Sequence, residues 1–206
     1  WSYNVYKKIM KIFDCFQYFD EDMMLDLRLH VLNKYVDKFV IVENLFMHSG
    51  KKKKQNFNIQ NFKKFENKIK YILVNELPEN LVNLDNLTGS KRTNSLIDNT
   101  LKIEHNQRNK ITDGLNEANS DDLILISDVD EIPKLENIRE KIKNKIICFN
   151  QKMFCYKFNL CFDKLDWIGT KATLKKNLLS PQWLRDVKHR KYPSWRIDAF
   201  FNKMKY

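Results

Sequence analysis

Two aspartates separated by one residue are the strongest chemical signal in the sequence. Asp128 and Asp130 follow the apolar run 123–126, which predicts a buried strand. In an extended segment such side chains point to the same side, so both carboxylates can converge on one divalent cation while Val129 points into the fold. A hard cation held there, Mn²⁺ or Mg²⁺, can bridge a diphosphate and neutralise a departing nucleotide. The structural alternative is a helix cap or turn, since Pro133 predicts a helix nearby.

Further polar residues are expected at the same edge of the molecule. Arg108 lies on the helix predicted before the strand that ends at Asp128, where a guanidinium could reach a pyrophosphate or a nucleotide ring. Glu43 ends another predicted strand, and the loop after it carries His48-Ser49-Gly50, whose amides and hydroxyl could meet phosphate or base. For Arg108 and His48 the alternative is a plain surface position.

The order of predicted elements is typical of an α/β domain. Strands are predicted at 9–16, 38–43, 70–74 and 123–126, with helices at 22–36, 59–68 and 100–118 between them and an irregular connection at 76–98. A helix of about ten residues from Pro133, strands at 145–149, 153–160 and 167–174, and a helix from Ser180-Pro181 to Asp186 follow. We therefore expect a mainly parallel central sheet flanked by helices, with a mixed edge. Ligands bind such sheets at the carboxyl ends of strands, where Asp128 stands.

Composition limits the remaining possibilities. With 206 residues and 43% hydrophobic content, we expect one domain over residues 1–206. No stretch approaches the roughly 20 apolar residues of a membrane span. Four cysteines without close pairs predict buried free thiols in a reducing compartment, so we expect a cytoplasmic protein, or one held at a membrane by a segment outside this chain. The net charge of +11 is spread along the chain, and we expect no nucleic-acid partner.

Seven segments match a known family pattern in order and spacing, and they are Lys11-Ile12-Phe13-Asp14-Cys15-Phe16, Asp37-Lys38-Phe39-Val40-Ile41-Val42-Glu43, His48-Ser49-Gly50, Gln107-Arg108-Asn109, Ser127-Asp128-Val129-Asp130-Glu131-Ile132-Pro133, Trp167-Ile168-Gly169-Thr170 and Pro181-Gln182-Trp183-Leu184-Arg185. Together they resemble glycosyltransferase family 17, which contains the enzymes that add the bisecting N-acetylglucosamine to N-glycans.

The resemblance implies a GT-A-like nucleotide-sugar-binding fold, UDP-N-acetylglucosamine as donor, Mn²⁺, inversion at the anomeric carbon, and a mannose-type glycan acceptor. It implies that Asp128 and Asp130 serve the metal and diphosphate, Arg108 the nucleotide, and Glu43 the base or ribose pocket. Family members usually continue into a Gly-Trp-His-rich segment that helps to close the site. This chain ends at Tyr206 before such a segment, so we expect a catalytic domain truncated at its C-terminal end.

An inverting transfer needs a group that takes the proton of the acceptor hydroxyl. Glu131, Asp163 and Asp166 are the candidates, and Asp166 is preferred because it precedes Trp167, an aromatic residue that could stack on a sugar.

Two other hypotheses remain open from the sequence. A haloacid-dehalogenase-like phosphohydrolase would use Asp128 and Asp130 as nucleophile and general acid, but that class usually carries its motif near the amino terminus. A basic nucleic-acid-binding module would gather aromatic and basic residues on one face, which the sequence does not visibly show.

Overall fold

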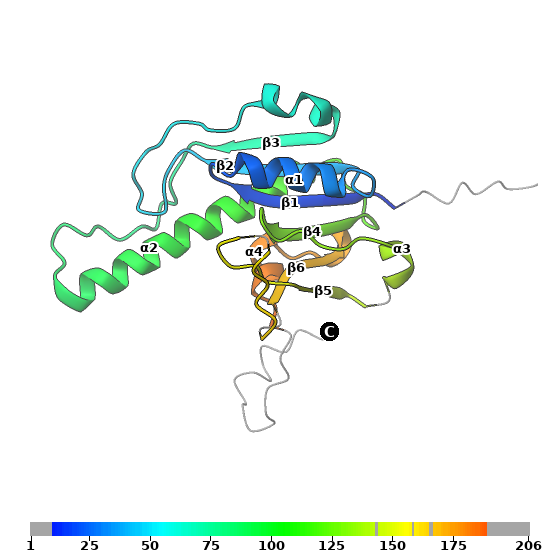
Figure 1. Ribbon diagram of the computed structural model, residues 1–206. Coiled ribbons are helices and arrows are strands. Elements are labelled where there is room, and N and C mark those ends of the chain that lie inside the picture. The colour runs from blue at the N-terminus through cyan, green and yellow to red at the C-terminus, as the bar shows by residue number, and fades with distance from the viewer. Residues whose placement is uncertain (1–9, 143, 158, 165–166, 189–206) are drawn as a thin grey trace, which may run out of the picture.

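A six-stranded sheet organises the protein. The computed structural model describes residues 10–142, 144–157, 159–164 and 167–188. The strand order is β3-β2-β1-β4-β6-β5 (Figure 1). In that order the bounds are Ile69–Val74, Lys38–Asn44, Ile12–Tyr18, Leu123–Asp128, Trp167–Leu174 and Ile146–Gln151. Strands β1 to β4 pair in parallel, whereas β6 is antiparallel to both β4 and β5. The predicted mainly parallel sheet with a mixed edge is confirmed.

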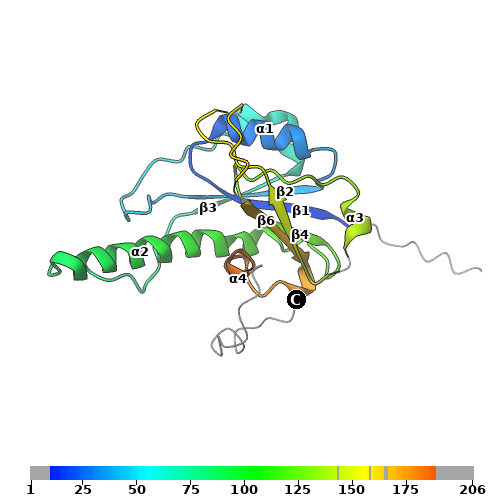
Figure 2. The same cartoon turned by 60° about the horizontal axis from the view of Figure 1, so that its bottom comes forward.

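Helices cover both faces of this sheet. Helix α1 (Asp22–Leu32) and the 3-10 segment η1 (Ile59–Lys68) pack on one face, and α2 (Gly89–Asn109), η2 (Lys110–Gly114) and α4 (Pro181–Asp186) lie on the other (Figure 2). Two short elements, α3 (Ile138–Lys141) and η3 (Lys175–Asn177), complete the fold.

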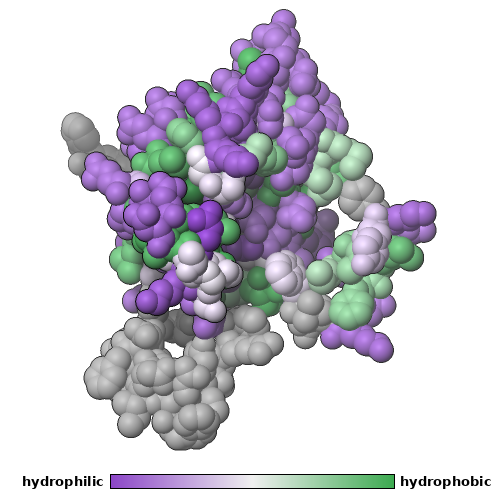
Figure 3. Space-filling view, turned by 90° about the vertical axis from the view of Figure 1, so that its left-hand side faces the viewer, coloured by the Kyte–Doolittle hydropathy of each residue, from purple (hydrophilic) through white to green (hydrophobic). Residues whose placement is uncertain are grey.

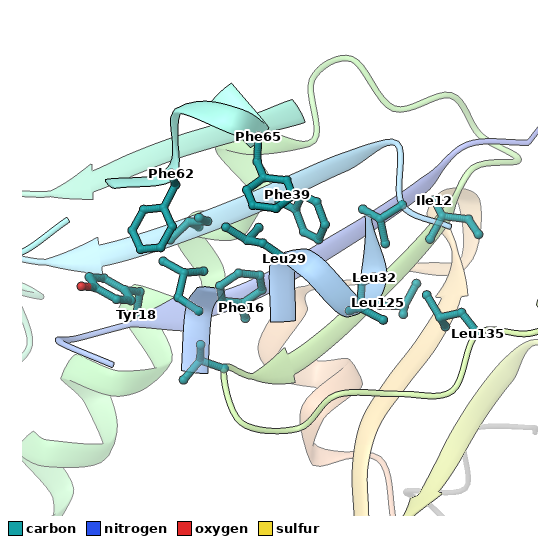
Figure 4. Packing of buried hydrophobic residues seen from close by; sticks show 14 of the residues in the cluster. Ile12, Phe16, Tyr18, Leu29, Leu32, Phe39, Phe62, Phe65, Leu125 and Leu135 are labelled. Carbon is teal, nitrogen blue, oxygen red and sulfur yellow. The ribbon is translucent and has the colours of Figure 1, made fainter. Parts of the chain in front are cut away.

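The central strands are apolar because they are buried on both sides. In β1, Ile12 and Phe16 join the cluster under α1, which Figure 4 shows with Leu29 and Phe39 packed around them. Phe13 belongs to the cluster on the opposite face. Each fully buried side chain of this size contributes about 1.5–3 kcal/mol, so the two clusters hold β1 and β4 in fixed positions and with them the residues at their ends.

The first four predicted strands are confirmed, although β1 runs to Tyr18 rather than ending at Phe16. The long second helix begins at Gly89, well before the predicted Thr100. Its amino-terminal part is polar and resembles a loop in sequence. The connection before it folds back along the helix, because the Asn99 amide accepts a hydrogen bond from the Val82 N–H and donates one to the Val82 carbonyl, each 2.8 Å long.

Two predicted elements of the C-terminal half are wrong. Residues 131–135 have no regular structure, and only the short α3 follows. Asn137 has a φ of 57°, which interrupts a helix, while Leu135 is buried in the cluster under α1. Tertiary packing therefore overrides the local helix signal. The strand predicted at 153–160 is reduced to one bridge between Phe154 and Cys161, since Tyr156 has a φ of 65° that no strand contains.

All four cysteines are free thiols, as predicted, but only Cys15 is fully buried. Burial raises the pKa of the Cys15 thiol well above its ordinary value. Within the described residues, no helix combines the length and the apolar character needed to cross a membrane.

Candidate functional site

The strand order creates a crevice at the carboxyl ends of β1 and β4. β1 pairs with β2 on one side and with β4 on the other, so the connections leaving these strands diverge, which is where open α/β sheets bind their ligands. A cavity of about 590 Å³ lies there, and Figure 3 shows this edge as a face with a hydrophilic recess. Its walls come from β1, the loop after β2, α2 and the end of β4: Gln17, Tyr18, Phe19, Glu21, Phe46, Met47, His48, Ser49, Glu104, Gln107, Arg108, Asp128, Val129 and Asp130.

Both aspartates of the sequence motif line this cavity, although they are not in one extended segment as predicted. Strand β4 ends at Asp128, and the next residues form a turn closed by a hydrogen bond from the Glu131 N–H to the Asp128 carbonyl (3.1 Å). Val129 is buried, as expected. Asp130 is exposed at the rim, yet partial desolvation raises the pKa of its carboxyl, and the neighbouring charges of Glu131 and Asp128 raise that pKa further.

A fully buried arginine holds this turn in place. Arg28 on α1 forms a two-pronged ion pair with Asp14 of β1, with N–O distances of 2.6 and 2.8 Å. Its Nη1 donates to the carbonyls of Asp128, Val129 and Glu131 at 2.9–3.2 Å. Because the guanidinium presents donors in a rigid fork, one buried side chain fixes three carbonyls of the turn that carries the aspartates.

Helix α2 is fastened to the sheet by two glutamines. Gln107 Nε2 donates to the Val42 carbonyl (2.9 Å), and Gln17 Nε2 donates to the Glu104 carbonyl (3.1 Å). These contacts place the last turn of α2 above the strand ends, and Arg108 lies on that turn.

Arg108 reaches the end of β4 as the sequence predicts. Its Nη2 contacts Asp128 Oδ1 at 3.1 Å and Glu104 Oε1 at 2.8 Å, while Nη1 donates to Gln182 Oε1 at 2.6 Å. The side chain is buried, and its Nε has no hydrogen-bond partner within the part of the chain that the structure describes. A buried donor without a partner is uncommon, and here it belongs to a residue of the cavity wall.

A second arginine, which the site prediction from sequence omits, binds Asp128 from the other side. Arg185 on α4 contacts Asp128 Oδ2 at 2.6 Å and both oxygens of Glu131 at 2.6 and 2.9 Å. Glu131 is buried, and it also accepts hydrogen bonds from the Asp128 N–H (3.0 Å) and from Trp167 Nε1 (3.0 Å). Each oxygen of the Asp128 carboxylate therefore faces its own arginine.

The other predicted site residues fall into two groups. His48 and Ser49 are exposed and line the cavity, and Gly50 closes their turn with a φ of 81° and a hydrogen bond from its N–H to the Met47 carbonyl (2.8 Å). Glu43 is at the same edge but fully buried and outside the cavity wall. It binds Lys53, the Asn56 and Phe57 N–H groups and the Tyr71 hydroxyl, and so anchors the loop after β2.

The candidates for a catalytic base are not brought together. The Glu131 carboxylate is occupied by its partners, and Asp163 is exposed and lines neither this cavity nor the one that adjoins it. Asp166 lies outside the described residues.

Possible metal ligands at the site are the two aspartates. Among the described residues, no group of three or more His, Cys, Asp or Glu side chains could hold a metal ion. Asp130 has no cationic side chain within ion-pair distance in that part of the chain. A cation here would need ligands from its substrate or from water, an arrangement that Mg²⁺ commonly adopts with phosphates.

Four side chains around the candidate site escaped the prediction, and two of them left a weak signal. Arg28 and Asp14 are opposite charges inside apolar segments, which predicts a buried pair. Gln182 and Arg185 follow Ser180, whose hydroxyl accepts from the Trp183 N–H (3.1 Å) and caps α4 as expected. Their position on a capped helix next to α2 could not be read from local sequence.

Fold and cavity together define an α/β protein whose ligand site lies at the switch point of a mainly parallel sheet. The model of glycosyltransferase family 17 matches residues 1–180, and the chain belongs to this family. The protein is therefore a glycosyltransferase, which favours group transfer over the hydrolase and nucleic-acid-binding hypotheses. No curated protein and no solved structure matches the chain significantly.

Proposed function

We propose that the protein transfers N-acetylglucosamine from UDP-N-acetylglucosamine to a mannose-type glycan acceptor, with inversion, in a metal-dependent reaction on a GT-A-like fold. Family membership supports the reaction class. The observation that carries the proposal is the cavity at the ends of β1 and β4, where two carboxylates and a buried arginine line one space of about 590 Å³.

Asp128 and Asp130 fit a divalent cation in the chemistry of their donors. Carboxylate oxygens are preferred by Mn²⁺ and Mg²⁺, which often take one or two carboxylates and complete their shell with substrate phosphates. Asp130 is accessible, and the Asp128 side chain is 40% exposed despite its two arginines. When bound, the cation supplies Lewis-acid stabilisation of the departing diphosphate. Arg108 and Arg185 add positive charge beside the same position.

The nucleotide is assigned to the part of the wall formed by the end of β1 and the loop after β2. The His48 and Ser49 side chains offer polar contacts, and Phe19 and Phe46 supply rings that can stack on a base. Glu43 acts indirectly in this proposal, because it secures the loop after β2 through the Asn56 and Phe57 N–H groups.

We assign the role of catalytic base to Asp166, the residue that the sequence analysis prefers. In this role its carboxylate takes the proton of the acceptor hydroxyl. Glu131 is the weaker candidate, since its buried carboxylate is held by Arg185 and Trp167 and serves to orient them. Asp166→Asn should abolish transfer while UDP-N-acetylglucosamine still binds. Retained transfer would move the assignment back to Glu131.

Calorimetry with UDP-N-acetylglucosamine, with and without Mn²⁺, tests the proposed donor and metal. We expect binding that strengthens at least about tenfold with Mn²⁺, equivalent to about 1.4 kcal/mol. Equal affinity in the two conditions would contradict the metal role. Absence of binding in both would contradict the donor assignment.

A further inference from the structure

A second cavity adjoins the first and shares its two aspartates. It measures about 580 Å³ and lies against the turn after β4, whose residues Asp128, Asp130 and Glu131 line it. Asp128 and Asp130 line both cavities. The remaining walls come from α1, the segment 131–134, the end of β5 with the loop that follows it, and the first residue of β6.

We propose that this second cavity binds a sugar ring of the acceptor glycan, with Trp167 as the residue on which that ring stacks. This proposal rests on the proposed transfer reaction, because it places the acceptor of that reaction in the second cavity. A transfer between two molecules requires both to meet at the reacting atoms. Two cavities that share one pair of carboxylates meet this requirement, with the donor on one side of the aspartates and the acceptor on the other.

The wall of this cavity combines apolar rings with amides, as a sugar site requires. Trp167 and Phe154 are exposed by 38% and 48%, and Leu27 of α1 adds apolar surface. Sugar rings present C–H groups on their faces and hydroxyls at their edges, so they need flat apolar surface together with a few polar groups. The side chains of Asn150 and Gln151 supply amides beside the rings.

Trp167 is held in a fixed orientation. Its Nε1 donates to Glu131 Oε1 at 3.0 Å, and the same carboxylate is clamped by Arg185. Gln151 is likewise oriented, because its Oε1 accepts from the Thr170 N–H at 2.8 Å, which leaves its NH₂ group to offer to a ligand. Because these side chains are already ordered, ligand binding costs less conformational entropy.

Gly169 makes this close arrangement possible. A Cβ at this position would come within 2.2 Å of Gln151 Oε1 and 2.8 Å of the Glu131 carboxyl carbon. A side chain at this position would force Gln151 and Glu131 to shift, so the glycine lets both groups approach β6 next to Trp167. The same chain of contacts links the wall of this cavity to Arg185 and thereby to Asp128.

The test compares aromatic variants of the two cavities. Trp167→Ala and Phe154→Ala should each weaken binding of a mannose-terminated oligosaccharide, measured by NMR in the presence of UDP and Mn²⁺, with a dissociation constant raised roughly tenfold for Trp167→Ala. The affinity of Phe154→Ala for UDP-N-acetylglucosamine should stay within about twofold, because Phe154 does not take part in the contacts that lead from Trp167 to Asp128. Phe19→Ala removes an exposed ring from the first cavity. This variant should weaken binding of UDP-N-acetylglucosamine and leave the affinity for the oligosaccharide unchanged. Tyr156→Ala, in the same loop as Phe154 but fully exposed and outside the cavity, is the matched control and should change neither affinity.

The outcomes separate this inference from the proposed function. Loss of UDP-N-acetylglucosamine affinity in Phe154→Ala would assign the second cavity to the nucleotide and overturn the inference. So would a wild-type protein that binds UDP-N-acetylglucosamine but not the oligosaccharide, or one whose oligosaccharide affinity survives both substitutions. A wild-type protein that does not bind UDP-N-acetylglucosamine would instead contradict the proposed donor. Phe154→Ala also keeps the test decisive if Trp167→Ala fails to fold.

Discussion

Two arginine–carboxylate clusters meet at the turn after β4, and they differ in access to the cavity. Arg28 and Asp14 are both fully buried, and the guanidinium is saturated by carboxylate, hydroxyl and carbonyl oxygens. Arg108 and Arg185 bind Asp128, whose side chain is 40% exposed. The first cluster has no route to a ligand and acts on the backbone, whereas the second can exchange its contacts when a ligand enters.

The difference follows from the cost of burying charge. A buried ion pair gains little over an apolar pair of the same shape, but removing one partner leaves an unpaired charge in the interior. A partly exposed pair is screened by water and can be replaced by a phosphate or a cation. The same chemical pairing therefore gives rigidity at one position and exchange at the other.

Breaking the buried cluster should have the largest effect. Arg28→Ala leaves Asp14 unpaired and releases three carbonyls of the turn, so the free energy of unfolding should fall by about 3–5 kcal/mol. Chemical denaturation measures this loss. Arg139→Ala is the control, because that arginine is about half exposed and should change stability by no more than about 0.5 kcal/mol. A loss below about 1 kcal/mol in Arg28→Ala would show that other groups can support the turn.

Removing Arg185 should have an intermediate effect on stability and a different effect on the site. Glu131 keeps its bonds to Trp167 and to the Asp128 N–H, so Arg185→Ala should cost about 1–3 kcal/mol. Asp128 loses a competing cation, and Mn²⁺ affinity without nucleotide should therefore rise. Electron paramagnetic resonance of free Mn²⁺ measures that affinity. Arg185→Lys, which keeps the charge, should stay near the wild-type value. A fall in Mn²⁺ affinity in Arg185→Ala would contradict competition between arginine and metal.

The sequence predicted the parallel half of the sheet because β1, β2 and β4 are buried on both faces and read as continuous apolar runs. One rule, that ligands bind at strand ends, predicted that Asp128, Arg108 and His48 lie close together, and all three line one cavity. The rule does not give side-chain direction. Glu43 ends its strand at the right edge, but its carboxylate is buried against the Tyr71 hydroxyl instead of facing the cavity.

The missed residues act over long sequence separations. Arg28 donates to the Val129 carbonyl 101 positions away, and Arg185 contacts Asp128 57 positions away. No periodicity encodes such pairs. A long-range contact also explains why the chain after Glu131 is irregular. Leu135 packs under α1, and this packing overrides the helix that Pro133 predicts.

Asp130→Asn should have the smallest effect on stability while removing metal-dependent binding. Desolvation and the charges of Glu131 and Asp128 raise the Asp130 pKa in the folded protein, so the ionised carboxylate is less favourable there than in the unfolded chain. The wild-type protein and the variant should have equal stability at acidic pH, where Asp130 is protonated in both states, and the variant should be equal or slightly more stable at neutral pH. Thermal unfolding at several pH values, together with Mn²⁺-dependent calorimetry, measures both effects.

A substantial loss of stability in Asp130→Asn would instead identify the carboxylate as a structural cap of the turn. Such a result would leave Asp128 as the single carboxylate for a cation, so that metal binding would depend on exchange of its ion pairs with Arg108 and Arg185.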